Sequence, residues 1–170
     1  MKNTAINSLG YTGIVTISQY IGSKKVKIAQ IHNEGRKSLF NFIADCLAGD
    51  FDSASIDRPY KIMLLKATKD IGSDELILEK RSDFISLVSN PEKIYSPNSG
   101  IVRYSFIVTK DKLDTTDFNC IGLYAKSTIV SESDINNFAA ICEVDTGEYQ
   151  LSISSALVID WELHVSNMED

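Results

Sequence analysis

The chain has 170 residues, of which 44% are hydrophobic and 24% charged, the proportions of an ordinary globular protein. This length suits a single domain over residues 1–170 and is short for two. The net charge of −6, with acidic residues scattered along the chain, disfavours a nucleic-acid partner. One folded domain is therefore expected.

Membrane insertion and disulfide bonding are also disfavoured. No uninterrupted apolar run approaches the roughly 20 residues that a helix needs to cross a bilayer. Residues 1–13 lack the apolar core of a signal peptide, which predicts that the protein is made and kept in a cytoplasm. Cys46, Cys120 and Cys142 are far apart and odd in number, which favours reduced thiols.

Residues 13–33 predict a half-buried β-hairpin around a turn at residues 22–25. The densest basic cluster of the chain falls at its tip, where charges keep a turn solvated. His32 is predicted to end the second strand, where a turn hydrogen bond satisfies it. The residues of this pattern are Val15, Ile17 and Ile21 on one face of the first strand, Val26 and Ile28 on one face of the second, and Lys24, Lys25 and Lys27 at the tip.

The period then changes to that of a helix. Leu39, Ile43 and Leu47 recur at intervals of four, and Gly49 is typical of a helix C-terminal stop. This spacing predicts one amphipathic helix over residues 36–48. Its wide apolar stripe is expected to cover the core of a sheet.

The middle of the chain mixes one clear strand with a weaker pattern. Residues 58–68 are apolar on both faces, which predicts a strand that begins at Pro59 and is buried on two sides. Residues 69–100 lose this regularity, and residues 75–90 fit either a strand or a short helix. We therefore predict an irregular excursion there, a common place for contacts.

Four strands are predicted after the excursion, at residues 101–113, 119–127, 137–146 and 156–167. The first and last alternate most regularly. The fold class is mainly β, an antiparallel β-sandwich-like domain with the one amphipathic helix. The residues expected inward are Val102, Tyr104, Phe106, Val108, Leu157, Ile159, Trp161, Leu163 and Val165, and those expected outward on the last strand are Asp160, Glu162 and His164.

The strongest enzyme-like signal is the tripeptide of Asp145, Thr146 and Gly147, which aspartic proteases also contain. Those enzymes use two such carboxylates, so a dimer would have to supply the second copy. Glu148 and Tyr149 follow the glycine here, whereas the protease motif continues with a small residue. A β-turn explains the tripeptide more simply.

No metal, cofactor or catalytic site is predicted. His32 and His164 lie on different strands without further ligands at a suitable spacing. Asp114, Asp117 and Asn119 could chelate a hard cation, but an EF-hand needs more oxygen ligands, and a polar turn before a strand explains them. No glycine-rich phosphate loop is present, and a non-enzymatic protein is expected.

The last third of the chain resembles the closing half of a phage tail-fibre attachment module, the tail-collar type of N-terminal domain. That family shows a Gly-Leu-Phe/Tyr strand, then a loop and an apolar strand, and finally an alternating strand that ends in Val-Ser-Asn. The matching residues are Gly122, Leu123 and Tyr124, then Ala139, Ala140 and Ile141, and finally Trp161, Leu163, Val165, Ser166 and Asn167.

Residues 13–51 resemble the opening of small virion proteins from phages of low-GC bacteria, with a hairpin, an Asn-x-Gly turn at residues 33–35 and a helix that ends in Leu-Ala-Gly. Members of the tail-collar family usually continue into a repetitive fibre shaft, whereas this sequence stops at Asp170. A free-standing adaptor, collar or baseplate component is therefore expected.

The resemblance implies a structural component of a bacteriophage virion, made in the host cytoplasm, that acts by self-association and docking on other virion proteins. A capsid-bound head-fibre base or decoration protein is the nearest alternative. A carbohydrate-binding β-sandwich is a further one, although Trp161 is expected in the core rather than on an exposed platform. Residues 69–100 and 127–137 are the candidate contact surfaces, and two ordinary solvent-exposed loops are the equal alternative.

Overall fold

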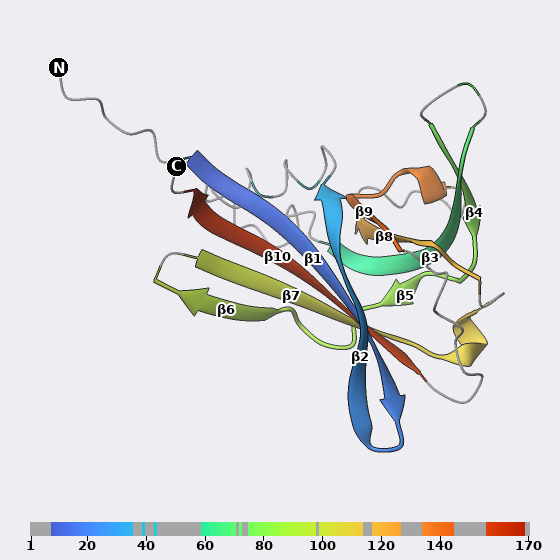
Figure 1. Ribbon diagram of the computed structural model, residues 1–170, viewed down its shortest axis with the longest axis horizontal. Coiled ribbons are helices and arrows are strands. Elements are labelled where there is room, and N and C mark those ends of the chain that lie inside the picture. Colours follow the sequence, from blue (N-terminus) through green and yellow to red (C-terminus); the bar gives the residue numbers. More distant parts are fainter. Residues whose placement is uncertain are drawn as a thin grey trace.

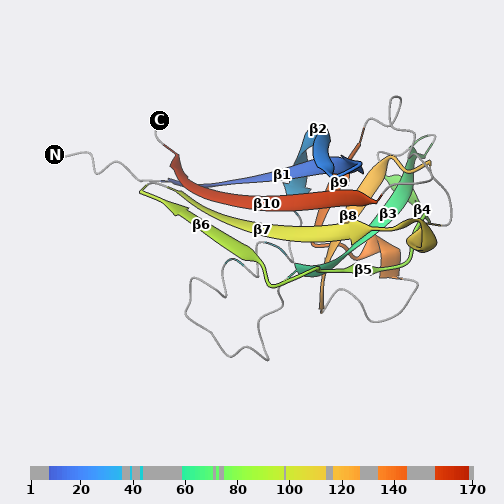
Figure 2. The ribbon, with the colours of Figure 1, turned by 90° about the horizontal axis from the view of Figure 1, so that it is seen from below.

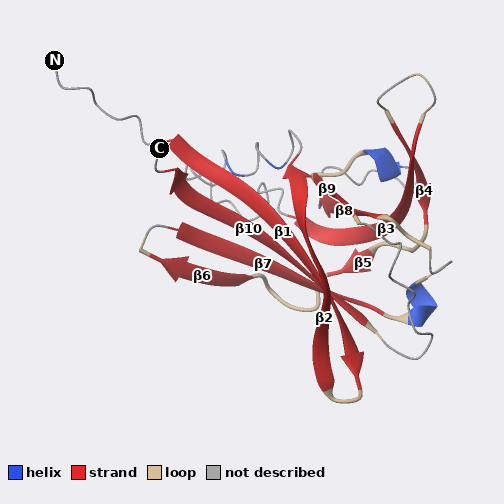
Figure 3. Cartoon of the chain, viewed as in Figure 1, coloured by secondary structure: helices blue, strands red, loops and turns tan. Residues whose placement is uncertain are grey.

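The computed structural model describes residues 8–35, 39, 43, 59–70, 72, 75–97, 99–113, 117–126, 134–144 and 156–168. Strands dominate this part of the chain, as Figure 3 shows. They are β1 (Ser8–Ile21), β2 (Lys24–Gly35), β3 (Pro59–Lys69), β4 (Leu76–Lys80), β5 (Ile85–Ser86), β6 (Glu92–Ser96), β7 (Ser99–Val108), β8 (Cys120–Ala125), β9 (Ala140–Glu143) and β10 (Leu157–Met168). The 3₁₀ helices whose bounds the structure describes are η1 (Lys110–Lys112) and η3 (Asp134–Asn136).

The strands form two antiparallel sheets that share β2 (Figures 1 and 2). The terminal sheet has the order β2-β1-β10-β7-β6, and both described chain ends belong to it. The second sheet has the order β9-β8-β3-β4, and β5 also pairs with β3. Residues Glu34 and Gly35 at the end of β2 pair with Ile141 and Ala140 of β9 and so join the two sheets.

The main core lies between the two sheets and confirms the predicted sandwich-like arrangement. Strict alternation along β10 and β7 places one face of each strand in this core, because successive side chains of a strand point to opposite sides. Trp161 and Phe106 are fully buried, and Tyr104 is 2% exposed. The other inward residues, also as predicted, are Val108, Leu157, Ile159 and Leu163, while Val102 packs against the core and Val165 is half-buried.

The second sheet is buried on both faces, as the double-sided apolar pattern of β3 predicts. Ile62 and Leu64 face the main core, whereas Met63 and Leu65 belong to a smaller cluster on the opposite face. Pro59 begins β3, as expected. The smaller cluster also contains Cys120, Tyr124 and Ile141, with Ala67, Leu76, Leu78, Phe84, Ile135 and Phe138 packed against it.

The predicted hairpin forms, but one of its core assignments is wrong. Val15 and Ile17 are buried, whereas Ile21 is 65% exposed. The reason is that β10 pairs with β1 only as far as Gln19, so the end of β1 projects past its neighbour. The β1–β2 pairing also shifts register after Ile17, which places a β-bulge in the hairpin.

The predicted helix at residues 36–48 lies mostly outside the described residues. Within it, the structure describes Leu39 and Ile43, and both are helical. Leu39 is fully buried in the main core, and Ile43 packs against the same cluster. These two positions agree with the predicted core-facing stripe.

Two predictions of irregular structure are wrong. Residues 69–100 contain β4, β5, β6 and the beginning of β7, and residues 75–90 contribute strands rather than a helix. The chain here passes from the edge of the second sheet at β4 to the edge of the terminal sheet at β6. The Asn-x-Gly turn expected at residues 33–35 is a strand, because β2 continues past Asn33 into the second sheet. His32 is consequently inside β2, not at its end.

Within the described residues, no helix has both the length and the hydropathy needed to cross a membrane.

Candidate docking surface

The outer face of the terminal sheet carries a continuous row of polar side chains. Asp160, Glu162 and His164 alternate with core residues along β10 and point away from the core. The strand register places Ser105 of β7 opposite Asp160, and Arg103 opposite Glu162. Opposite charges on neighbouring strands are therefore close enough to pair.

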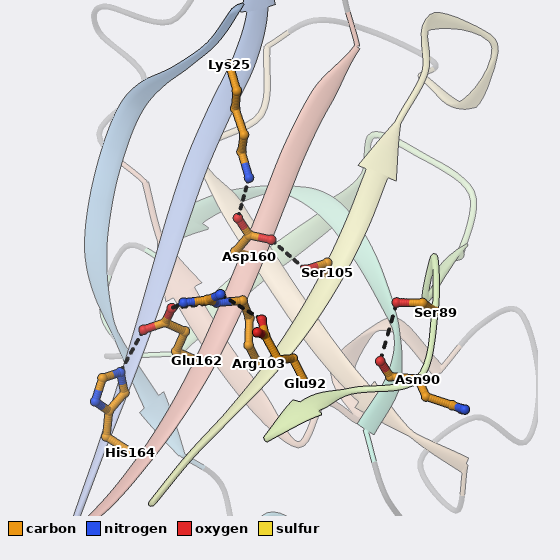
Figure 4. A network of polar contacts seen from close by, with 9 residues as sticks. All are labelled: Lys25, Ser89, Asn90, Glu92, Arg103, Ser105, Asp160, Glu162 and His164. Atoms are coloured by element: carbon orange, nitrogen blue, oxygen red, sulfur yellow. Dashed lines mark hydrogen bonds and ion pairs between the residues drawn. The ribbon is translucent and has the colours of Figure 1, made fainter. Parts of the chain in front are cut away.

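Asp160 is the centre of one polar contact (Figure 4). The Ser105 hydroxyl donates a hydrogen bond of 2.6 Å to Asp160 Oδ1. Lys25 Nζ reaches from the β1–β2 hairpin to Asp160 Oδ2, at 2.8 Å. The carboxylate is only 14% exposed, so this contact ties the turn end of the hairpin to β10 and β7.

Arg103 is the centre of a second contact, also drawn in Figure 4, which spans three strands. Its Nε and Nη2 both lie 2.8 Å from Glu162 Oε1 on β10. Its Nη1 donates a hydrogen bond of 2.8 Å to Glu92 Oε2 on β6. His164 Nε2 lies 2.9 Å from the other oxygen of Glu162. We call Arg103, Glu162, Glu92 and His164 the Arg103 network.

The Arg103 network holds Glu162 ionised. Partial burial by itself would raise the pKa of Glu162, but the hydrogen bonds from Arg103 and His164 outweigh it and hold the pKa below its ordinary value. The hydrogen bond to Glu162 likewise raises the pKa of Arg103. Both groups are therefore charged at neutral pH.

This arrangement suits binding better than catalysis. A general acid at neutral pH needs a carboxyl group whose pKa is raised, whereas the pKa of Glu162 is lowered. Asp160 is engaged by Lys25 and Ser105. The face thus presents paired charges held in a fixed geometry, which can align polar groups of a docked surface.

Bulky apolar side chains are exposed around this sheet and its partner, at strand edges and ends. Apolar side chains that are exposed singly are normal on a protein surface, whereas neighbouring ones that form a patch mark a contact surface. Tyr95 on the edge strand β6 is the most exposed, at 78%. The others are Tyr20 and Ile21 at the hairpin tip, Ile77 on the edge strand β4, Val88 after β5, and Ile107 near the end of β7.

The two histidines have different surroundings. His164 joins the Arg103 network on the outer face, as its predicted outward orientation allows. His32 is exposed on β2, and its carbonyl oxygen lies 4.0 Å from the Cys142 sulfur. In the described part of the chain, no three His, Cys, Asp or Glu side chains are grouped as metal ligands.

The polar residues at the predicted turn before β8 make contacts to β3 and to the residue after β4. The Asn119 side chain bonds to both backbone groups of Ala67, accepting from its nitrogen at 2.6 Å and donating to its oxygen at 2.9 Å. Asp117 lies 3.5 Å from Lys66 and 3.4 Å from Arg81. These groups are used to join β3 to the segment before β8. Asp114 and the tripeptide at residues 145–147 lie outside the described residues.

Cys120 and Cys142 are free, as predicted, and both are buried. They point to opposite faces of the second sheet, because Cys120 belongs to the smaller cluster and Cys142 to the main core. Burial raises the pKa of each thiol to about 12. Both thiols are therefore unreactive core residues. Cys46 lies outside the described residues.

The glycine of the Gly-Leu-Tyr segment has a packing role. A Cβ at Gly122 would lie 2.7 Å from the ring of Tyr124, so only glycine leaves room for the ring on this face. The Tyr124 hydroxyl donates a hydrogen bond of 2.8 Å to the Ile135 carbonyl oxygen in η3. Its ring also meets Phe84 edge to face, with centroids 5.0 Å apart. The segment thereby fixes η3 against the second sheet.

The sequence pattern did not predict that Arg103 and Lys25 would pair with the acidic residues of the outer face. The alternation of β10 predicts where Asp160 and Glu162 point, but it does not identify their partners. Arg103 and Ser105 alternate with the apolar residues of β7, so their outward direction could be predicted from the sequence. Their pairing with β10 depends on a register between strands about 55 residues apart in sequence.

Comparison with known proteins found no matching family model, no matching curated protein and no matching solved structure.

Proposed function

We propose that the protein is a non-enzymatic structural component of a bacteriophage virion, a tail or baseplate adaptor or fibre-attachment protein. In this role it works by self-association and by docking on other virion proteins. The sequence resemblance to the tail-collar module motivates the proposal. The residues that carry it belong to β8, to the start of β9 with the residue before it, and to β10, which contribute to the two apolar clusters of the domain.

The observation that carries the proposal is the combination of paired charges and exposed apolar residues. The acidic groups of the outer face are neutralised by Arg103, Lys25 and their neighbours, so they are arranged for shape and register rather than for proton transfer. Exposed apolar side chains stand at the strand edges and ends. Protein–protein interfaces combine an apolar centre with a polar rim, so the two features together support the proposal.

The described residues offer less support for a carbohydrate-binding module. Such a module needs an exposed aromatic platform, and Trp161 is fully buried. The exposed tyrosines, Tyr20 and Tyr95, stand on different strands, at the hairpin tip and on β6. They do not form one platform.

The proposal is tested on purified phage particles from a host that carries the coding sequence. Quantitative mass spectrometry should find the chain in the particles at a fixed copy number. Tails separated from capsids then locate it, and recovery with the tails is expected. Recovery with the capsids would support a head-fibre base or decoration protein instead, and absence from the particles would overturn a virion role.

A further inference from the structure

The β1–β2 hairpin ends in an exposed tip. In the described part of the chain, the backbone of residues Tyr20 to Lys25 pairs only within the hairpin, because the ladder with β10 stops at Gln19, although the Lys25 side chain reaches Asp160. Figure 1 shows this tip extending away from the rest of the terminal sheet. Gly22 makes the tight two-residue turn possible through its φ of +62°. We call Tyr20, Ile21, Gly22, Ser23 and Lys24 the hairpin tip.

The hairpin tip is both apolar and cationic. Ile21 is 65% exposed and Tyr20 is 43% exposed, although both are bulky apolar residues. Lys24 is exposed beside them, and Lys27 follows on the same strand. A short two-stranded ribbon gains little stability from exposed apolar side chains in water, so their presence there indicates a contact.

Charge is distributed unevenly along the chain, in a way that favours contact between copies. The first 33 residues contain four cationic and no acidic side chains. The rest of the chain has 13 cationic and 23 acidic side chains. The cationic hairpin of one copy is therefore opposite in charge to the net charge of the rest of another copy.

A matching acceptor lies at the end of the second sheet. A depression of about 310 Å³, open to solvent, is lined by Ala67, Lys69, Leu76, Asn119, Glu143 and Val144. Asp70 and Glu75 adjoin it at the β3–β4 turn, where the Asp70 N–H donates to the Glu75 carbonyl oxygen. The apolar wall is thus accompanied by three acidic residues and one lysine. We call this feature the acceptor depression.

We propose that the hairpin tip of one copy docks into the acceptor depression of a second copy. This inference rests on the proposed function, because it names the surfaces by which the protein would self-associate. The β1–β2 turn lies far from strands β4 and β9 in Figure 1, so a molecule does not fill its own depression. A contact between two different surfaces is heterologous and builds a ring or a filament.

The experiment measures association of the purified chain by sedimentation velocity over a range of concentrations. Ile21→Asp and Lys24→Glu should each weaken association at least about 10-fold, because a central apolar anchor and a paired charge typically contribute that much. Glu143→Lys should weaken it similarly. The Lys24→Glu/Glu143→Lys double variant should recover most of the loss, since it restores opposite charges across the contact.

Asn90→Asp is the matched control for an added charge, because Asn90 is exposed and belongs to neither surface. It should associate like the natural chain. Retained tryptophan fluorescence in each variant shows that the fold is intact. A natural chain that stays monomeric, an Ile21→Asp variant that associates normally, or a double variant that is no better than the single ones would overturn the inference.

These outcomes are separate from those of the proposed function. A chain that is present in phage particles but monomeric in solution would overturn the tip-to-depression contact and leave the virion role standing. A chain that associates through the hairpin tip but is absent from particles would overturn the virion role and leave the tip-to-depression contact standing.

Discussion

The side-chain amide of Asn33 on β2 lies directly against Gly13 on β1, its partner in the strand register. Oriented as its neighbours require, the amide nitrogen donates to the Gly13 carbonyl oxygen at 2.8 Å. The amide oxygen accepts a hydrogen bond of 3.1 Å from the indole Nε1 of Trp161. A polar side chain of the hairpin thus satisfies the donor of the fully buried tryptophan.

Replacing Asn33 should destabilise the fold. Asn33→Ala leaves the Trp161 N–H buried without this partner, and we expect a loss of about 1–3 kcal/mol in the free energy of unfolding. The chain contains one tryptophan, so urea unfolding followed by fluorescence reports on this site directly. Asn90→Ala, at an exposed asparagine, serves as the control and should change stability by less than about 0.5 kcal/mol. Equal losses in the two variants would contradict the role given to Asn33.

Gly13 should tolerate a side chain only when Asn33 is shortened. A Cβ at position 13 would overlap the Asn33 amide, so Gly13→Ala should cost about 1–3 kcal/mol. In the Asn33→Ala background the space is free, and the same substitution should cost clearly less. The double-mutant cycle in urea measures this coupling. Additive losses would show that the two positions do not act on each other.

The sequence predicts what depends on local period, and it fails where distant strands must meet. Alternation along β10 and β7 correctly assigns the core face, including Trp161. The exposure of Ile21 could not be predicted from the sequence. It follows from the pairing between β10 and β1, which ends at Leu157 and Gln19 and so leaves Ile21 beyond the ladder. The continuation of β2 through Asn33 was also missed, since the Asn-x-Gly pattern favours a turn and only pairing with β9 makes it a strand. The Arg103 network depends on register in the same way.

Arg103 should contribute more to stability than the exposed acid that it also binds. Arg103→Met keeps much of the side-chain volume but removes the charge from beside Glu162, which is only 17% exposed. We expect a loss of about 1–2 kcal/mol. Glu92→Gln alters the 60% exposed end of the same network and should cost less than about 0.5 kcal/mol. Thermal unfolding of both variants compares the two losses of stability. A larger loss in Glu92→Gln than in Arg103→Met would contradict the prediction.

Glu162 should make the fold sensitive to acid. Its pKa is lowered in the folded state, so the unfolded chain binds a proton at a higher pH than the folded chain does. The stabilisation that ionised Glu162 contributes is fully present above the pKa of about 4.3 of a glutamate in the unfolded chain. It is lost as the pH falls through the pKa of Glu162 in the folded state. Glu162→Gln should therefore show a shallower loss of stability on acidification below about pH 5. Urea midpoints at several pH values provide the measurement, and identical slopes would show that Glu162 is not a source of the acid sensitivity.

The buried cysteines should react only when the protein unfolds. Cys120 and Cys142 have a pKa raised to about 12 by burial, so almost no thiolate is present at pH 8, and the reagent is excluded from both sites. A Cys46→Ser variant isolates these two thiols. We expect negligible labelling by a disulfide reagent in the native state, labelling of both thiols in denaturant, and a rate in intermediate urea that follows the unfolded fraction. Rapid labelling of either thiol without denaturant would show that the second sheet opens locally at that strand.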